Sequence, residues 1–381
     1  MPELSPEDAL RLNVLLANEL HAVRIDESSM TLYALTPQGD TSIRLNPTCR
    51  DEQYLKAVRE LLSERVLGSP GGYPVFIRRW TRMGQARGEE SLGKLLLLGE
   101  PEAVVAVVHA PVLTDEIARR AWWAMQTSEN ARRLLACEAV ARGSMGPVLA
   151  EFLLEFLPFE ESPQAVIETV RLVLQPGLIG EEAKQKLWAR ARSKNPYYVG
   201  FMQALPDDLP EQAPPHPEWQ ARREMLQELA EGGNAVAGLL ARCLSASGQA
   251  FLATAQAAMR KPGNQEVAVE LAEALGSYFA PVALPGCRPM DMEPLQAQAE
   301  ARPQGMEGDQ LADDFRAVLD AWPEARPFLS ALCLLSGAGE RLLAPIFART
   351  DAVGSVMRKK IAPVFTPLAE AIQVLRGGKG R

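Results

Sequence analysis

The chain has 381 residues, of which 47% are hydrophobic and 23% charged, as in an ordinary globular protein with room for two or three domains. Its net charge of −8 argues against a protein whose whole surface binds nucleic acid, although it leaves room for a local basic patch. Aromatic residues make up only 6%, while leucine and alanine dominate, which favours helices over sheets.

The chain begins without the basic segment and apolar core of a secretory signal. Its most apolar windows are far too short to span a bilayer. We therefore expect a cytoplasmic protein.

The cysteines are scattered, and no two of them have the close spacing of a zinc site or a dithiol redox motif. We expect reduced thiols that are buried or idle, and no metal or cofactor. The five positions are Cys49, Cys137, Cys243, Cys287 and Cys333.

The first predicted elements form a small α+β domain over residues 1–88. Ser5, followed by proline and two acids, predicts a capped helix that runs to residue 20. A short antiparallel sheet is expected next, then a helix over 51–64 whose apolar residues fall on one face. The expected strands cover 22–25, 30–35, 41–45 and, after a Gly/Pro turn at 68–72, Tyr73–Trp80.

Short amphipathic helices with capping residues follow and define a helical domain over 89–205. Paired helices of this length are typical of a HEAT-like solenoid. The sequence has no fixed repeat period, however, so an irregular bundle fits equally well.

The rest of the chain is predicted to be a Pro- and acid-rich linker over 206–217 and a C-terminal helical region over 218–381. Residues 280–308 are rich in Pro, Met, Gln and acids, which indicates a long mobile loop, and the Gly-rich tail should be disordered. The fold class is therefore mainly α, with a small α+β domain at the N-terminus. Helices are expected over 219–231, 234–244, 248–259, 266–279, 311–322, 327–335, 339–347 and 353–374.

The strongest candidate for a binding site is an arginine-rich segment over 65–87, which has no acid after Glu64 until Glu89. Arginine forks and interleaved aromatic rings suit an anion, RNA or an acidic partner. Alternatively, these arginines pair with acids of the same domain, such as Glu60. The turn at 68–72 lacks the Lys-Ser/Thr of a phosphate-binding loop, so we expect a plain turn. The candidate residues are Arg65, Tyr73, Arg78, Arg79, Trp80, Arg82 and Arg87.

A second group of cations, among them Arg119 and Arg120, falls on helices next to the aromatic pair Trp122–Trp123. We expect these arginines to face solvent and to be balanced by nearby acids such as Glu116. One tryptophan should lie in the core and the other at a helix contact.

Several segments together resemble the DsrS family, whose members are encoded with the reverse-acting dissimilatory sulfite reductase system of sulfur-oxidising bacteria. The resemblance is strongest before residue 161 and weakest after the Pro-rich segment. It rests on SPEDALRLNVLLA (5–17), RIDES (24–28), LNPTCRDEQYL (45–55), GSPGGYPVFIRRWTRMGQ (68–85), LLLLGEPEAVVAVV (95–108) and RRAWWAMQ (119–126).

The resemblance implies a cytoplasmic accessory protein that supports oxidation of stored sulfur, with an associated role in post-transcriptional control. It implies no catalytic residues. We therefore expect a non-enzymatic regulatory protein that contacts proteins of the sulfur oxidation system. Two other hypotheses stay open: an RNA-binding regulator that uses the segment 65–87, and a sulfur carrier or enzyme that uses one cysteine, such as Cys49.

Overall fold

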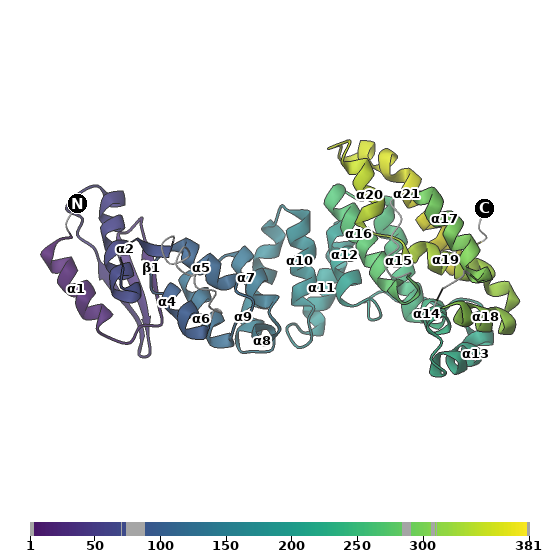
Figure 1. Ribbon diagram of the computed structural model, residues 1–381, viewed down its shortest axis with the longest axis horizontal. Coiled ribbons are helices and arrows are strands. Elements are labelled where there is room, and N and C mark those ends of the chain that lie inside the picture. The colour runs from purple at the N-terminus through teal and green to yellow at the C-terminus, as the bar shows by residue number, and fades with distance from the viewer. Residues whose placement is uncertain are drawn as a thin grey trace. The chain divides into compact units, whose positions relative to one another are not determined.

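The computed structural model describes residues 4–69, 71–73, 88–283, 291–305, 309 and 311–378. Helices dominate the described residues, and a three-stranded antiparallel sheet lies near the N-terminus, which confirms the expected fold class (Figure 1). The contacts divide the chain into two compact units. The first comprises Met1–Pro158 and Gln175–Ile179, and the second Phe159–Leu174 and Gly180–Arg381.

The first unit begins with the expected helix and sheet. Helix α1 (Pro6–Leu16) is capped by Ser5, whose Oγ accepts the Asp8 N–H at 3.1 Å. The strands pair in the order β1-β2-β3, with Val23 opposite Ala34 and Tyr33 opposite Ser42. The strands are β1 (Ala22–Asp26), β2 (Thr31–Thr36) and β3 (Gly39–Arg44), and α2 (Asp51–Leu67) packs with them around Leu12, Leu32, Tyr54, Val58 and Leu62.

A buried carboxylate joins three parts of this core. Asp8 is fully buried and accepts the Tyr54 hydroxyl at 2.5 Å and the Asn46 N–H at 2.7 Å. Burial, reinforced by Asp8, raises the pKa of Tyr54. Because a buried carboxylate is stable only with hydrogen-bond donors around it, this network fixes α1 against α2 and the segment after β3.

The rest of the first unit is an array of short helices that pack on near neighbours in the sequence: α5 on α4, α6 and α7, and α7 on α8 and α9. Such local packing is compatible with a helical repeat. The helices are α4 (Glu89–Leu95), α5 (Pro101–Val108), α6 (Asp115–Ala124), α7 (Ser128–Leu135), α8 (Glu138–Ala141), α9 (Met145–Phe156) and the 3₁₀ turn η1 (Leu157–Phe159).

The second unit is an irregular bundle, because its last helix returns to pack on helices from its middle. Helix α21 contacts both α15 and α19, and α16 contacts α19 and α20 (Figure 1). The elements are α10 (Pro163–Val173), α11 (Glu181–Ala191), α12 (Asn195–Ala204), α13 (Trp219–Glu231), α14 (Ala235–Leu244), α15 (Ala246–Arg260), α16 (Gln265–Tyr278), η2 (Ala280–Val282), α17 (Met292–Ala301), η3 (Arg302–Gln304), α18 (Ala312–Ala321), η4 (Pro323–Ala325), α19 (Arg326–Ser336), α20 (Glu340–Phe347) and α21 (Gly354–Leu375).

The Pro-rich segment 206–217 differs from the expected linker, because it lies inside the second unit. Its acids bind cations of that unit. Asp207 accepts both Nε (2.6 Å) and Nη2 (2.7 Å) of Arg242, and Asp208 binds Lys184 at 2.6 Å. These pairs hold an irregular segment against the bundle.

The expected mobile loop over 280–308 is also corrected in its described part, since residues 292–301 form helix α17. Its buried Leu295 and Ala299 face α19. Beyond it, Arg302 and Asp309 form an ion pair (Nε–Oδ2 2.8 Å) with side chains only 4% and 2% exposed. Arg302 also donates to the carbonyl of Val282. The pair thus ties both sides of α17 to the bundle.

His216 lies within the Pro-rich segment 206–217, and only 4% of its surface is exposed. Its Nδ1 accepts the Glu218 N–H at 3.1 Å, so the ring proton sits on Nε2. Burial lowers the pKa of this imidazole below its usual value of 6.5. The native ring is therefore neutral, and its protonation would break the bond to Glu218.

We expect Arg302→Met to lower the free energy of unfolding by about 3–5 kcal/mol, because it leaves the Asp309 carboxylate buried without its partner. Arg316→Met, which removes the exposed partner of Asp313, should cost less than about 1 kcal/mol. Urea unfolding of the full chain, followed by circular dichroism, measures both. Equal effects of the two substitutions would contradict the structural role of the buried pair.

The lowered pKa of His216 predicts a stability that depends on pH. The unfolded chain binds a proton at this residue before the folded chain does as the pH falls. The free energy of unfolding should thus be at its full value above pH 6.5 and decrease as the pH falls toward the folded pKa. His216→Leu should flatten that decrease, while substitution of the exposed His109 should not. Melting temperatures across this pH range provide the measurement.

Candidate functional site

Two of the seven residues of the candidate arginine-rich site belong to the described part of the chain. Arg65, near the end of α2, donates from Nη2 (2.8 Å) and Nε (3.2 Å) to the amide oxygen of Asn13. Its partner is therefore neutral, and not one of the acids expected from the sequence. Arg65 lines a hollow of about 340 Å³ together with Lys94. The other residues, Arg78, Arg79, Trp80, Arg82 and Arg87, lie outside the described residues.

The turn at the start of this segment binds groups of its own chain. Gly68 ends α2 in the left-handed conformation with φ of 68°, and its N–H bonds to the Glu64 carbonyl. The fully buried Ser63 donates to the Ser69 carbonyl at 2.8 Å and accepts the Gly72 N–H at 2.9 Å. These contacts fit the plain turn that the sequence predicts.

Tyr73, the second candidate residue, is fixed through its backbone. Its N–H donates to Glu100 Oε2 at 3.1 Å, and a Cβ on Gly72 would lie only 2.0 Å from Glu100 Oε1. Burial raises the pKa of Glu100, while the Tyr73 N–H and the nearby Arg59 oppose that rise. Gly72 and Tyr73 are helical, so the strand expected from Tyr73 onward does not begin there, and its remainder lies outside the described residues.

Two arginines of the second basic group, Arg119 and Arg120, pair with an acid of their own helix α6, as the sequence predicts. Glu116 accepts Arg119 at 2.8 and 2.9 Å and Arg120 at 2.7 Å. Hydrogen bonds from Arg119 and then Arg120 lower the pKa of Glu116 to about 2 despite partial burial. These arginines are therefore less available to an external anion than unpaired ones.

Trp122 lies in the core as predicted, whereas the polar and cation–π contacts of Trp123 with the described residues are to the strands β1 and β3 and not to another helix. Trp122 is 6% exposed and packs edge-on against Phe152, whereas the indole N–H of Trp123 donates to Asp40 at 3.1 Å. The guanidinium of Arg24 lies 4.8 Å from the ring centre of Trp123, a cation–π contact that joins β1 to α6. Two of the segments that carry the family resemblance thus meet in one contact.

The described cysteines include two buried thiols. Burial raises the pKa of Cys243, and it raises the pKa of Cys333 to about 12. Both are therefore protonated and out of reach of solvent. Cys49 and Cys137 are partly exposed, and Cys287 lies outside the described residues.

Within the described ranges, no three or more His, Cys, Asp or Glu side chains come together in a way that could hold a metal ion. The same residues include no single helix long and apolar enough to cross a membrane. Two sharply bent pairs of helices reach the required length and apolar composition only when the two helices are taken together.

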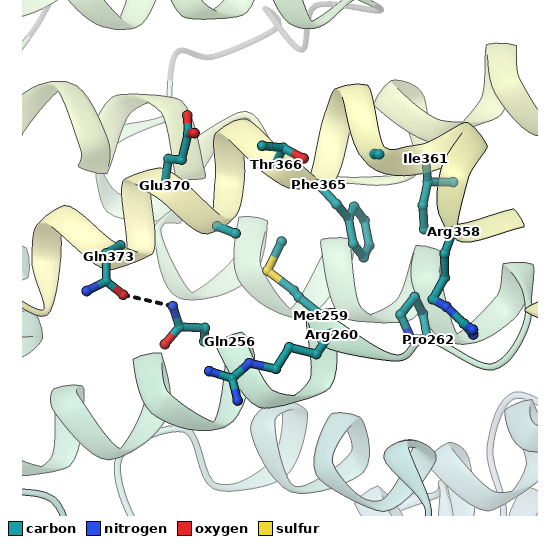
Figure 2. Close-up of a pocket in the computed structure, with 12 residues that line it drawn as sticks. Gln256, Met259, Arg260, Pro262, Arg358, Ile361, Phe365, Thr366, Glu370 and Gln373 are labelled. Carbon is teal, nitrogen blue, oxygen red and sulfur yellow. Dashed lines mark hydrogen bonds between the residues drawn. The ribbon is translucent and has the colours of Figure 1, made fainter. Parts of the chain in front are cut away.

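A groove that the sequence did not predict lies between the end of α15 and the length of α21, within the second unit (Figure 2). Its volume is about 460 Å³, which is in the range of ligand-binding pockets. Its floor is apolar: Met259, Ile361 and Phe365 are 8%, 1% and 7% exposed. We call this feature the α15–α21 groove.

Two cations border the α15–α21 groove. Figure 2 shows Arg358 reaching from α21 toward Pro262, whereas the side chain of Arg260 runs from the end of α15 back toward Gln256. Neither guanidinium has a hydrogen-bond or ion-pair partner among the described side chains, although Arg260 is exposed and Arg358 half-buried. Such cations are available to an external anion.

Two amides join the walls of the groove at the end that Gln256 and Gln373 form. Gln256 of α15 donates to the Gln373 oxygen of α21 at 2.9 Å, and Arg376 donates to the Gln256 oxygen. Glu370 lies on the rim away from Gln256 (Figure 2). Among its lining residues, the groove therefore carries two cations, Arg260 and Arg358, and one carboxylate, that of Glu370.

One sequence signal could have indicated the cations of this groove. Residues 352–369 include three cations and no acid, and residues 243–265 include Arg260 and Lys261 and no acid. Such stretches are unusual in a chain with a net charge of −8. Their convergence on one groove depends on the return of α21 to α15, which neither stretch predicts.

Comparisons with models of protein families, with curated proteins and with solved structures found no match. The resemblance to the DsrS family therefore stays a prediction from the sequence segments quoted above.

The hydrogen bonds of Ser63 hold the turn over 68–73, and this role can be tested. Ser63→Ala removes two hydrogen bonds and leaves the buried Gly72 N–H unpaired, which should cost about 1–3 kcal/mol. Faster hydrogen exchange at the Gly72 amide should accompany the loss. Ser28→Ala, at an exposed turn, should change stability by less than about 0.5 kcal/mol. Unchanged exchange at Gly72 would show that Ser63 does not hold the turn.

Proposed function

We propose that this chain is a non-enzymatic, cytoplasmic accessory protein that supports oxidation of stored sulfur by the reverse dissimilatory sulfite reductase system. It acts by contact with proteins of that system, and through this contact it controls the amount of their components after transcription. The assignment to the sulfur system rests on the resemblance to the DsrS family.

The observation that carries the mode of action is the α15–α21 groove. Its floor consists of side chains that are buried almost completely, yet the space above them is empty enough for a ligand. Apolar grooves between helices are a common binding site for protein segments, since the occupant buries apolar surface and its polar groups meet the rim.

Photo-crosslinking in cells that oxidise stored sulfur tests this proposal. A photoreactive residue at Thr366, which lines the groove, should capture proteins of the sulfur oxidation system. The same residue at Lys186, an exposed position on α11, should not. Capture of no sulfur protein at Thr366, or equal capture at both positions, would contradict the proposal.

A second candidate is an RNA-binding regulator that uses the segment 65–87, and Arg65 supports it. Among the described residues, the side chain of Arg65 hydrogen-bonds only the neutral amide of Asn13, so its charge stays available for a phosphate. Arg65→Ala, combined with alanine at 78, 79 and 82, should then weaken RNA binding and reduce its dependence on salt. A gel shift without RNA affinity at low salt would remove this candidate.

A further inference from the structure

We propose that the α15–α21 groove binds an acidic amphipathic helix of a partner protein. The inference rests on the proposed mode of action, and it adds the chemistry of the segment that is bound. The occupant places an apolar row on the floor of the groove and carboxylates against Arg260 and Arg358.

The dimensions of the groove favour a helix over a compact small molecule. Its α21 wall runs from Arg358 to Gln373. At 1.5 Å of rise per residue, this wall is roughly 22 Å long, or about four helical turns. A helical segment of similar length can lie along it and place apolar side chains from successive turns over the floor.

The side chains on the α21 side of the groove are small where a neighbouring helix would need room. Ala362, Thr366 and Ala369 line the groove, and they follow one another at spacings of three and four residues along one face of α21. Their small side chains leave the larger Ile361, Phe365 and Met259 to form the floor. Small residues of this kind allow the backbone of a second helix to come close.

Charge determines which helix fits. Arg260 and Arg358 have no partner among the described residues, and the exposed side chains of Lys261 and Lys359 likewise have none. By contrast, Lys360 donates to the Thr350 hydroxyl at 2.6 Å. A basic rim attracts an acidic segment and repels a basic one, which sets both the rate of association and the choice of partner.

The apolar floor also favours a helix over a nucleic acid as the ligand. RNA would use the cations of the rim and gain little from Met259 or Ile361, since its phosphates are recognised by charge. A helix uses both the floor and the rim. Loss of the apolar contact should therefore weaken binding of a helix and leave binding of RNA unchanged.

Fluorescence anisotropy with the purified full chain provides the test. The probe is a labelled synthetic helix of about 16 residues, with leucines at every third or fourth position and glutamates between them. We expect saturable binding of this probe. Replacement of its glutamates by lysines, or of its leucines by serines, should each weaken binding by about tenfold or more.

Variants of the chain locate the binding. Arg260→Glu with Arg358→Glu should weaken binding of the acidic probe by about tenfold or more, and Thr366→Trp, which fills the groove from an exposed position, should do the same. Lys186→Glu on α11 should leave binding unchanged. Circular dichroism of each variant shows that it is folded.

Three results would overturn the proposal: no saturable binding of the acidic probe, equal binding of the acidic and lysine probes, or binding that survives Thr366→Trp. Displacement of the probe by a 16-residue oligo(U), with loss of oligo(U) binding in the arginine variant alone, would assign the rim to RNA. If crosslinking at Thr366 captures sulfur proteins but the acidic probe does not bind, only the choice of helix fails. If the probe binds but no sulfur protein is captured, only the proposed function fails.

Discussion

A single buried amide holds the end of the last helix against the middle of the second unit. Gln249 of α15 is 5% exposed, and its Nε2 donates to the carbonyls of Cys243 and Leu375, each at 2.9 Å. Both acceptors lie at helix ends, at Cys243 in α14 and Leu375 in α21, where carbonyls have no partner within their own helix. Because an amide has two N–H donors, one side chain satisfies both ends and joins three helices. This connection, together with the packing of α21 on α15 and α19, places the two walls of the α15–α21 groove.

The other wall of the groove is held in a similar way. Asn195 donates to the carbonyls of Ala258 (3.0 Å) and Lys261 (2.6 Å), and so fixes the last turn of α15 from the side of α12. At the opposite end of α15, the chain turns by 74° from α14. Gly248 allows this corner, since a Cβ there would lie 2.0 Å from the Arg242 carbonyl. The rims that carry Arg260 and Arg358 are therefore positioned by polar contacts at helix ends.

The sequence predicted most helices of the second unit to within a few residues, because capping residues and apolar periodicity are local signals. Asn234 and Asn264 cap α14 and α16 through their side chains, as asparagine before an apolar run indicates. Helix α17 was missed, since its segment is polar and buries little beyond Leu295 and Ala299. The docking of 206–217 was missed because its acids pair with cations from distant helices. The groove was missed for the same reason, as its walls come from two segments far apart in the chain.

The distribution of ion pairs explains how an acidic chain keeps a basic groove. In the second unit, Asp207, Asp208 and Asp309 bind Arg242, Lys184 and Arg302, and these pairs hold segments that lack regular structure. Those acids thus form ion pairs at segments whose backbone is not held by regular secondary structure. Around Arg260, by contrast, the carbonyls at the end of α15 are satisfied by the amide of Asn195, and Arg358 lies on the regular helix α21. No carboxylate is needed there for structure, so the two arginines keep their charge available to a partner.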